Sequence, residues 1–450
     1  MRRRALPPDS RAPGPEQRGK IAGVRLGAVA IVAVAFAPVA RSAPPAYERP
    51  PINYSHAKPR DAVARLLQRI AAGEVVLTGS DQEILRALLR ELGIPVESQI
   101  LVFSKTSLQS GLIAPESPRA LYFSDSVYVG WVPGGLIEAA AIDPELGPVF
   151  YAFDPQDARD ARRSLVRETT CLRCHGETFS REIPGLIERS VVVSDRGELL
   201  PGQGEELVDD ATPFERRWGG WYVTGYGGRQ SHLGNAFGVA RDGQIEFSPS
   251  LERPLELSHR FDTSRYLTTT SDVVALLVFQ HQLAMHNSLT RAAQRCRRAL
   301  DSQRVAQIAA NEPLTAAPAS ENARNVYDTA AADVVDHLLF RGAAPLPNGV
   351  AGTDGFRRAF AAGAPRSAKG DTLKDLSAHG RLFANRCSFL IYSESFGALP
   401  PALQDRIFSR LAAALRGGDV SGRFAYLEKD ERRRIVEVLT ETVPQAARYF

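Results

Sequence analysis

The chain has 450 residues, of which 44% are hydrophobic and 24% charged, as in an ordinary globular protein. The formal net charge is +4, but residues 1–42 alone carry eight basic and two acidic side chains, so residues 43–450 have a net charge of about −2. The excess of basic residues therefore belongs to the N-terminal segment. The charge gives no reason to expect nucleic acid or an anionic membrane as a partner.

An apolar run near the N-terminus predicts export. Residues 26–37 (LGAVAIVAVAFA) follow Lys20 and Arg25, and the small residues Ala40 and Ser42, on either side of Arg41, offer a cleavage site. This order is that of a secretory signal peptide. We therefore expect residues 1–42 to be removed from a protein exported to the periplasm. The run is short for a membrane span, so we expect no stable membrane insertion after cleavage, and an uncleaved N-terminal anchor is the alternative.

The first elements after this leader are expected to be helices and then strands. Residues 61–72 and 81–92 repeat apolar side chains at helical spacing, which predicts two amphipathic helices. Beyond Gly93 the chain changes to short β-branched and aromatic runs separated by turn residues, which predicts an antiparallel meander. The predicted strands are 99–103, 120–123, 127–132 and 149–153.

The most specific motif of the chain follows this meander. Residues 171–175 read Cys-Leu-Arg-Cys-His, the C-x-x-C-H signature of covalent haem attachment. Two intervening residues in a helical turn place both sulfurs on one edge of a porphyrin, where they form thioethers, and the adjacent histidine reaches the iron. The motif thus predicts one covalently bound haem c on Cys171 and Cys174, with His175 as the proximal iron ligand.

Two other interpretations of the C-x-x-C pair stay open. A redox-active dithiol would suit an oxidising compartment. A zinc site would need further ligands, and the sequence contains no second C-x-x-C and no H-x-x-x-H pair. In each case the motif is expected on a short helical turn, with Thr169 or Thr170 as its cap.

Strands resume after the motif and then give way to helices. The predicted strands are 190–193, 198–200, 221–224 and 237–240. Ser271 is expected to cap a strongly apolar helix that runs from Asp272 to about Cys296. The remainder is expected to be mostly helical, with loops at 312–322 and 342–355 and helices at 401–416 and 429–442.

These elements predict an α+β fold in three segments. Residues 1–42 are the signal peptide, residues 43–265 form a mixed antiparallel β/α core that carries the haem, and residues 266–450 form an α-helical region packed on that core. Two cysteines lie outside the motif, Cys296 and Cys387. They either form a disulfide in the oxidising compartment or remain as buried thiols.

The sixth position of the iron decides what the haem can do. A protein ligand there favours electron transfer, whereas an open position lets small molecules bind. Met285 is the only methionine besides the initiator and shares a helix face with His281, so it is one candidate distal ligand. His232 is the second, because the glycines of its loop (225–235) permit close approach to a flat cofactor. His281 and His286 are weaker candidates, and an open position is the alternative.

Several segments resemble one group of large bacterial proteins. They are Arg119–Phe123, Val127–Gly130, Arg216–Gly225, His232–Asn235 and Cys387–Ser393. Together with the C-x-x-C-H motif they resemble large proteins described as cytochrome c domain-containing, rather than the small helical cytochrome c. The resemblance covers most of the chain after residue 42. It implies haem c and export, and it brings no established reaction.

The function expected from these features is periplasmic electron transfer through one haem, with a redox partner protein that the sequence does not identify. The alternative is a haem enzyme of peroxidase type, or a sensor of a small ligand or of redox state, with an open sixth position. A peroxidase would need an acid–base group near the iron, which His232 or Glu215 would supply.

Overall fold

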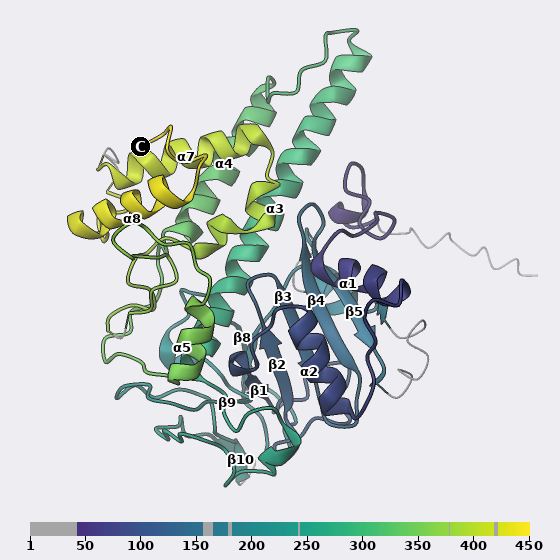
Figure 1. The fold of residues 1–450 in the computed structure, drawn as a ribbon, viewed down its shortest axis with the longest axis vertical. Helices are drawn as coiled ribbons and strands as arrows, with labels where there is room; N and C mark the ends of the chain where they lie inside the picture. Colours follow the sequence, from purple (N-terminus) through teal and green to yellow (C-terminus); the bar gives the residue numbers. More distant parts are fainter. Residues whose placement is uncertain (1–42, 156–164, 179–181, 242–243, 378, 418–421) are drawn as a thin grey trace, which may run out of the picture. The chain divides into compact units, whose positions relative to one another are not determined.

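A seven-stranded antiparallel sheet lies at the centre of the fold (Figure 1). The computed structural model describes residues 43–155, 165–178, 182–241, 244–377, 379–417 and 422–450, so the predicted signal peptide lies outside the described residues. The strand order is β6-β5-β4-β3-β2-β1-β9. The strands are β1 (Ile100–Val102), β2 (Arg119–Phe123), β3 (Val127–Trp131), β4 (Ile137–Asp143), β5 (Gly147–Phe153), β6 (Leu165–Arg167) and β9 (Trp221–Tyr222).

The meander expected between residues 99 and 153 is present, but it contains a strand that the sequence did not predict. β4 reads Ile-Glu-Ala-Ala-Ala-Ile-Asp, and alanine and glutamate are poor strand formers. It is a strand because it pairs over its length with β5 and over five residues with β3. Tertiary pairing thus overrides the local preference of the segment.

Two small sheets follow the motif. β7 (Arg189–Val191) pairs with β8 (Glu205–Leu207), and β10 (Val239–Arg241) pairs with β11 (Gln244–Glu246). The strand predicted at 198–200 contributes only a single bridge, between Val193 and Leu199. With the helices described next, these sheets confirm the predicted α+β class.

Eight α-helices are found among the described residues. They are α1 (Ala62–Ala71), α2 (Asp81–Glu91), α3 (Val273–Ala309), α4 (Glu321–Leu338), α5 (Asp354–Ala361), α6 (Glu394–Gly397), α7 (Pro401–Leu415) and α8 (Lys429–Thr442). The predicted helices 61–72, 81–92, 401–416 and 429–442 agree with α1, α2, α7 and α8. α3 is much longer than predicted, because no glycine or proline interrupts the chain until Pro313.

The N-cap of α3 is Asp272, and the prediction of Ser271 is wrong. The carboxylate of Asp272 accepts hydrogen bonds from the backbone N–H groups of Val274 (2.8 Å) and Ala275 (3.0 Å). The hydroxyl of Ser271 instead joins two strands: it accepts from Leu101 N (2.9 Å) and donates to Tyr222 O (2.6 Å). Ser271 therefore anchors the start of α3 to the edge of the sheet formed by β1 and β9.

The two faces of the sheet have different coverings. Side chains alternate between the faces of a strand, and one face is covered by α1 and α2 (Figure 1). On this face the hydroxyl of Tyr151 donates to Asp61 Oδ2 (2.5 Å), and Asp61 also caps α1 by accepting from Ala64 N (2.9 Å). Through Asp61, these two hydrogen bonds connect the start of α1 to β5.

We call the opposite face the motif face. Its side chains include those of Arg119, Glu138 and Phe150, with Gly130 between them. α3 covers one part of it, where the ring of Phe279 lies 5.7 Å from the ring of Tyr128. The part on β4, β5 and β6 is more open: Ala140 and Ala152 are half-buried, and Val166 is 57% exposed.

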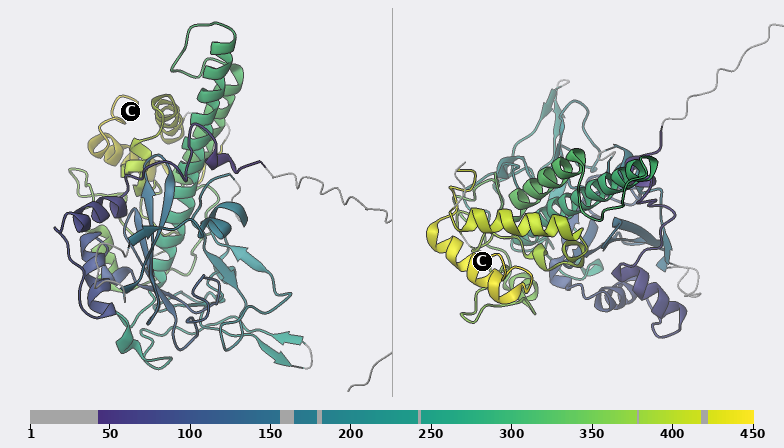
Figure 2. Two further views of the ribbon diagram at one scale, coloured as in Figure 1. Left: turned by 90° about the vertical axis from the view of Figure 1, so that its right-hand side faces the viewer. Right: turned by 90° about the horizontal axis from the view of Figure 1, so that it is seen from above.

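The helices after residue 273 pack on α3 and on one another. α3 and α4 lie side by side (Figure 2), and α4 in turn packs against α7. Residues 44–450 form one compact unit. Cys296 and Cys387 are both buried thiols without a disulfide, which agrees with the second of the two expected states. Within the described part of the chain, no helix has the length and apolar character needed to span a membrane.

Candidate haem attachment site

The C-x-x-C-H motif forms a tight turn directly after β6. The N–H groups of Cys174 (3.2 Å) and His175 (2.9 Å) both donate to the carbonyl oxygen of Cys171. Because residues three and four apart lie on one side of a helical turn, Cys171, Cys174 and His175 share one side. The carboxylate of Glu168 accepts from Thr170 N (2.7 Å), so it stabilises the start of the turn at the place expected for a threonine cap.

The imidazole of His175 is held through its Nδ1 atom. Nδ1 lies 2.8 Å from the carbonyl oxygen of Gly185, and Gly185 N donates to His175 O at 2.7 Å. A carbonyl oxygen only accepts, so Nδ1 carries the proton. Burial is the largest influence on the ring and lowers the pKa of His175, which favours the neutral form. The lone pair on Nε2 is therefore available, as a metal-ligating histidine requires.

The motif face supplies the surroundings of this imidazole. The ring of Phe150 lies 4.7 Å from the ring of His175. Arg119 and Glu138 form an ion pair at 2.6 Å and are only 20% and 17% exposed. Arg119 lowers and Glu138 raises the pKa of His175, so both charges lie near the ring. The sheet thus places a half-buried cation and anion beside the expected proximal ligand.

Two glycines make room for this arrangement. A Cβ atom at Gly130 would collide with the guanidinium of Arg119, so the bare backbone of β3 is what lets Arg119 lie across the sheet toward Glu138. A Cβ atom at Gly176 would collide with the hydroxyl of Tyr47, so the segment around Tyr47 packs directly on the motif turn. Glycine inside a strand often marks such a close approach.

Three residues around His175 were not predicted from the sequence as part of a site: Arg119, Glu138 and Gly185. A signal for the first two was present, since Arg119 and Glu138 are charged residues within mostly apolar strands, and Gly130 interrupts a third strand. No signal pointed to Gly185, because its contribution is a backbone carbonyl whose position depends on tertiary folding.

The environment of Cys171 differs from that of a redox-active thiol. Burial, then Glu138 and Glu168, raise the pKa of Cys171 to about 12, and Arg119 opposes them. Reactive dithiols carry a thiol whose pKa is lowered by nearby positive charge or a helix N-terminus. A zinc site also lacks support in the described ranges, where no group of three or more His, Cys, Asp or Glu side chains is arranged to hold a metal ion.

The residues present fit a covalently bound haem. Cys171 and Cys174 are free thiols, one half-buried and one exposed, at the spacing that two vinyl groups need. His175 offers an unprotonated Nε2, and the porphyrin itself supplies the other iron ligands in its plane, so no cluster of protein ligands is required. The half-buried Ala140 and Ala152 leave an apolar surface of small side chains on the motif face.

Met285 does not lie beside His175. The side of α3 that faces the motif is marked by Asn287, whose amide exchanges two hydrogen bonds with the backbone of Leu186 (2.8 and 2.7 Å). Met285 is two residues from Asn287 and so points about 160° away on the helix. It shares its side with His281, which packs against the C-terminal region at Phe340.

The histidines of α3 have other partners. His281 Nδ1 lies 2.9 Å from Asp210 Oδ2, and its Nε2 lies 2.7 Å from the hydroxyl of Ser388. His286 Nε2 donates to the carbonyl oxygen of Asp125 (2.9 Å). Both imidazoles are thus used in packing and hydrogen bonding within the core.

His232 and Glu215 lie at the other edge of the sheet. The ring of His232 packs edge-on against Trp218 at 5.4 Å, and its neighbour Asn235 bonds to Trp221 of β9. β9 is five strands from β5 in the sheet order, which is about 24 Å at about 4.8 Å per strand. Burial lowers the pKa of His232 to about 4, so it is a neutral core histidine. The structure therefore brings none of the distal candidates to His175.

Comparisons with protein-family models, with curated proteins and with solved structures gave no match. The assignment of this site consequently depends on its own residues and geometry.

Proposed function

We propose that the chain is an exported c-type haem protein that carries electrons through one haem, attached at Cys171 and Cys174, with His175 as the proximal ligand. The observation that carries this proposal is the hydrogen bond from His175 Nδ1 to Gly185 O, which leaves Nε2 free to ligate iron. A bound haem supplies one-electron chemistry, and the protein holds and orients it.

The position of the motif supports electron transfer. Cys174 is exposed and Cys171 half-buried, while Val166 on the neighbouring strand is 57% exposed. A cofactor tied to these cysteines has an edge at the protein surface, where a redox partner protein can approach. The imidazole of His175 meanwhile lies in the half-buried part of the site against Phe150, which keeps its orientation fixed.

The Arg119–Glu138 pair favours a second function, the binding or conversion of a small ligand at an open sixth position. A half-buried guanidinium stabilises negative charge that develops on a bound ligand, and a nearby carboxyl group can exchange protons. In this alternative Arg119 and Glu138 are the charged and acid–base groups near the iron, a role for which the sequence had indicated His232 or Glu215.

Attachment is tested by the intact mass of protein made in cells that mature c-type cytochromes. We expect the mass of the chain from Ala43 plus one haem. The Cys171→Ala/Cys174→Ala protein should carry no covalent haem, and Cys296→Ala should carry the normal amount. A wild-type mass without haem in such cells contradicts the proposal.

The two functions are separated by the optical spectrum of the ferrous protein with and without carbon monoxide. A low-spin spectrum that carbon monoxide leaves unchanged supports the electron carrier. A high-spin resting form, or rapid formation of a carbon monoxide complex, rejects the simple carrier and supports the small-ligand function.

A further inference from the structure

A pocket away from the haem motif lies between α3 and α4. It has a volume of about 480 Å³ and is lined by four residues of each helix. This volume is within the usual range for small-molecule sites. The lining residues of α3 are Arg295, Arg298, Ala299 and Ser302, and those of α4 are Asn322, Asn325, Val326 and Thr329.

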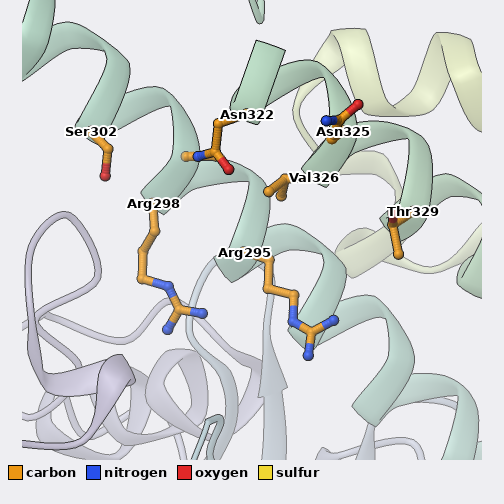
Figure 3. A pocket seen from close by; sticks show the side chains of 8 residues that line it. Arg295, Arg298, Ser302, Asn322, Asn325, Val326 and Thr329 are labelled. Atoms are coloured by element: carbon orange, nitrogen blue, oxygen red, sulfur yellow. The ribbon is translucent and has the colours of Figure 1, made fainter. Parts of the chain in front are cut away.

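Figure 3 shows how these side chains are distributed. Arg295 and Arg298 extend from α3 toward the same end of the pocket. Asn322 and Asn325 come from α4 with neutral amide groups, and Ser302 adds a hydroxyl from α3. The pocket therefore combines positive charge with neutral groups that can both donate and accept hydrogen bonds.

Three arginines share one carboxylate at this end of the pocket. Glu182 is the shared carboxylate of three arginines: it binds Arg295 through two bonds of 2.7 and 2.8 Å and lies 3.6 Å from Arg291 and 3.5 Å from Arg298. Arg49 is close enough to lower the pKa of Arg298.

Asp333 of α4 is a second carboxylate near these arginines, since it raises the pKa of Arg295. Among the residues that the structure describes, four guanidinium groups and two carboxylates thus lie near this end of the pocket, and Arg295 and Arg298 line it.

One arginine also has an unused donor. Nη1 of Arg298 is buried and has no hydrogen-bond partner among the residues that the structure describes. A buried donor without a partner destabilises a protein, and a guanidinium binds a carboxylate through two parallel bonds. A change of the Arg298 rotamer that turns this guanidinium into the pocket lets an anionic ligand supply the missing acceptor.

We propose that this pocket binds a small organic polycarboxylate. Two guanidinium groups one helical turn apart attract a molecule with several carboxylates and bind it through the donors that Glu182 leaves unused, and the amides and hydroxyl on the pocket walls suit its remaining oxygens. The site is separate from the haem motif, so its occupation does not depend on the function proposed for the haem.

Calorimetric titration of the mature, haem-loaded protein with citrate tests the proposal, with sodium chloride added to keep the ionic strength constant. We expect saturable binding to one site. Arg298→Gln should weaken it roughly 10- to 100-fold, since one charge-assisted contact is lost. Asn325→Leu, at an exposed position that leaves the arginines in place, should also weaken it.

Arg291→Gln is the matched control, because Arg291 contacts Glu182 but does not line the pocket, and it should change citrate affinity much less than Arg298→Gln. Absence of saturable citrate binding to wild type overturns the proposal. So does an affinity that Arg298→Gln and Asn325→Leu both leave unchanged. Inorganic phosphate that binds as tightly as citrate overturns the assignment to a polycarboxylate.

Discussion

The hydrogen bond between His175 and Gly185 determines which ring nitrogen is free, and the Arg119–Glu138 pair determines the charge around it. These two contacts act on different properties. The first orients the imidazole of His175, the proposed proximal ligand, and fixes its tautomer. The second places opposite charges near the imidazole of His175, so each should change the balance between the ferric and ferrous states of the proposed haem.

We predict that Arg119→Gln lowers the reduction potential of the haem and that Glu138→Gln raises it. Loss of a nearby positive charge favours the ferric state, and loss of a negative charge favours the ferrous state. At an effective dielectric constant of about 20, each change should amount to a few tens of millivolts. Redox titration followed by optical absorbance measures it.

Arg216→Gln is the control for this pair, because Arg216 lies with β9 at the far edge of the sheet and bonds to Glu206. The reduction potential of the Arg216→Gln protein should equal that of wild type. Shifts of the same sign in Arg119→Gln and Glu138→Gln would show that neither charge acts directly on the haem.

A second residue-scale prediction concerns the buried carboxyl of Glu188. Its Oε1 accepts from Gln280 Nε2 at 2.5 Å, and burial raises the pKa of Glu188 to about 8, with Gln280 and Arg217 opposing the shift. A folded-state pKa above the unfolded value means that the proton stabilises the fold. This stabilisation is complete below about pH 4.5 and is lost as the pH rises through 8.

Glu188→Gln removes this titration. We expect the unfolding free energy of wild type to fall relative to the variant between pH 5 and pH 8.5, by a few kcal/mol at most, at about 1.4 kcal/mol per pKa unit. Urea unfolding at a series of pH values measures the difference. A constant difference across this range would mean that Glu188 is ionised in the folded protein.

At the scale of elements, the sequence pattern predicted those helices whose formation depends on interactions between residues close together in the chain. The periodicity of α1, α2, α7 and α8 and the C-x-x-C-H turn could be read from the sequence. The alanine-rich β4 could not, because it is a strand through its pairing with β3 and β5. The length of α3 could be inferred only by noting that no breaker precedes Pro313, since its polar second half weakens the apolar pattern.

The two sides of α3 have different neighbours, and the candidate ligand Met285 lies on the side away from Asn287. Met285 and His281 sit four residues apart in an apolar helix, which in sequence looks like the wall of a haem pocket. The helix instead presents Asn287 to the motif segment and turns His281 toward Phe340. Which side of a buried helix faces a cofactor depends on packing partners that lie far away in the sequence.

We predict that Met285→Leu leaves the optical spectrum of the haem unchanged. Met285 is fully buried on the side of α3 that faces away from the motif, so the exchange of two side chains of similar volume should cost less than about 1.5 kcal/mol. His175→Ala is the positive control and should abolish the low-spin spectrum. Loss of the absorption band of methionine-ligated iron in Met285→Leu would return Met285 to the ligand position.

At the scale of the whole molecule, α3 joins the sheet to the C-terminal helices. One side of it packs on the motif face and the other on α4, so residues 44–450 share a core within one unit. Cys296 lies on α3 and Cys387 precedes a short helical segment, Phe389–Tyr392, in this shared core. Burial raises the pKa of each thiol to about 12, so both are unreactive in the folded state.

The number of reactive thiols therefore tests the haem and the fold together. In the mature haem protein Cys171 and Cys174 are thioethers under the proposed function, and Cys296 and Cys387 are buried. We predict that a thiol reagent such as Ellman's reagent finds no reactive thiol in the native haem protein and two after denaturation without reductant. Protein made without haem should show four after denaturation, because the structure contains four free cysteines.

Any other number of reactive thiols indicates a different chemical state of the four cysteines. No thiol in the denatured, unreduced haem protein, with two released by reductant, would show a Cys296–Cys387 disulfide. Four thiols in protein from haem-competent cells would show that Cys171 and Cys174 are unmodified, which contradicts covalent attachment. Cys296→Ala should lower the count in the denatured haem protein from two to one, because Cys387 then remains as the single thiol outside the motif.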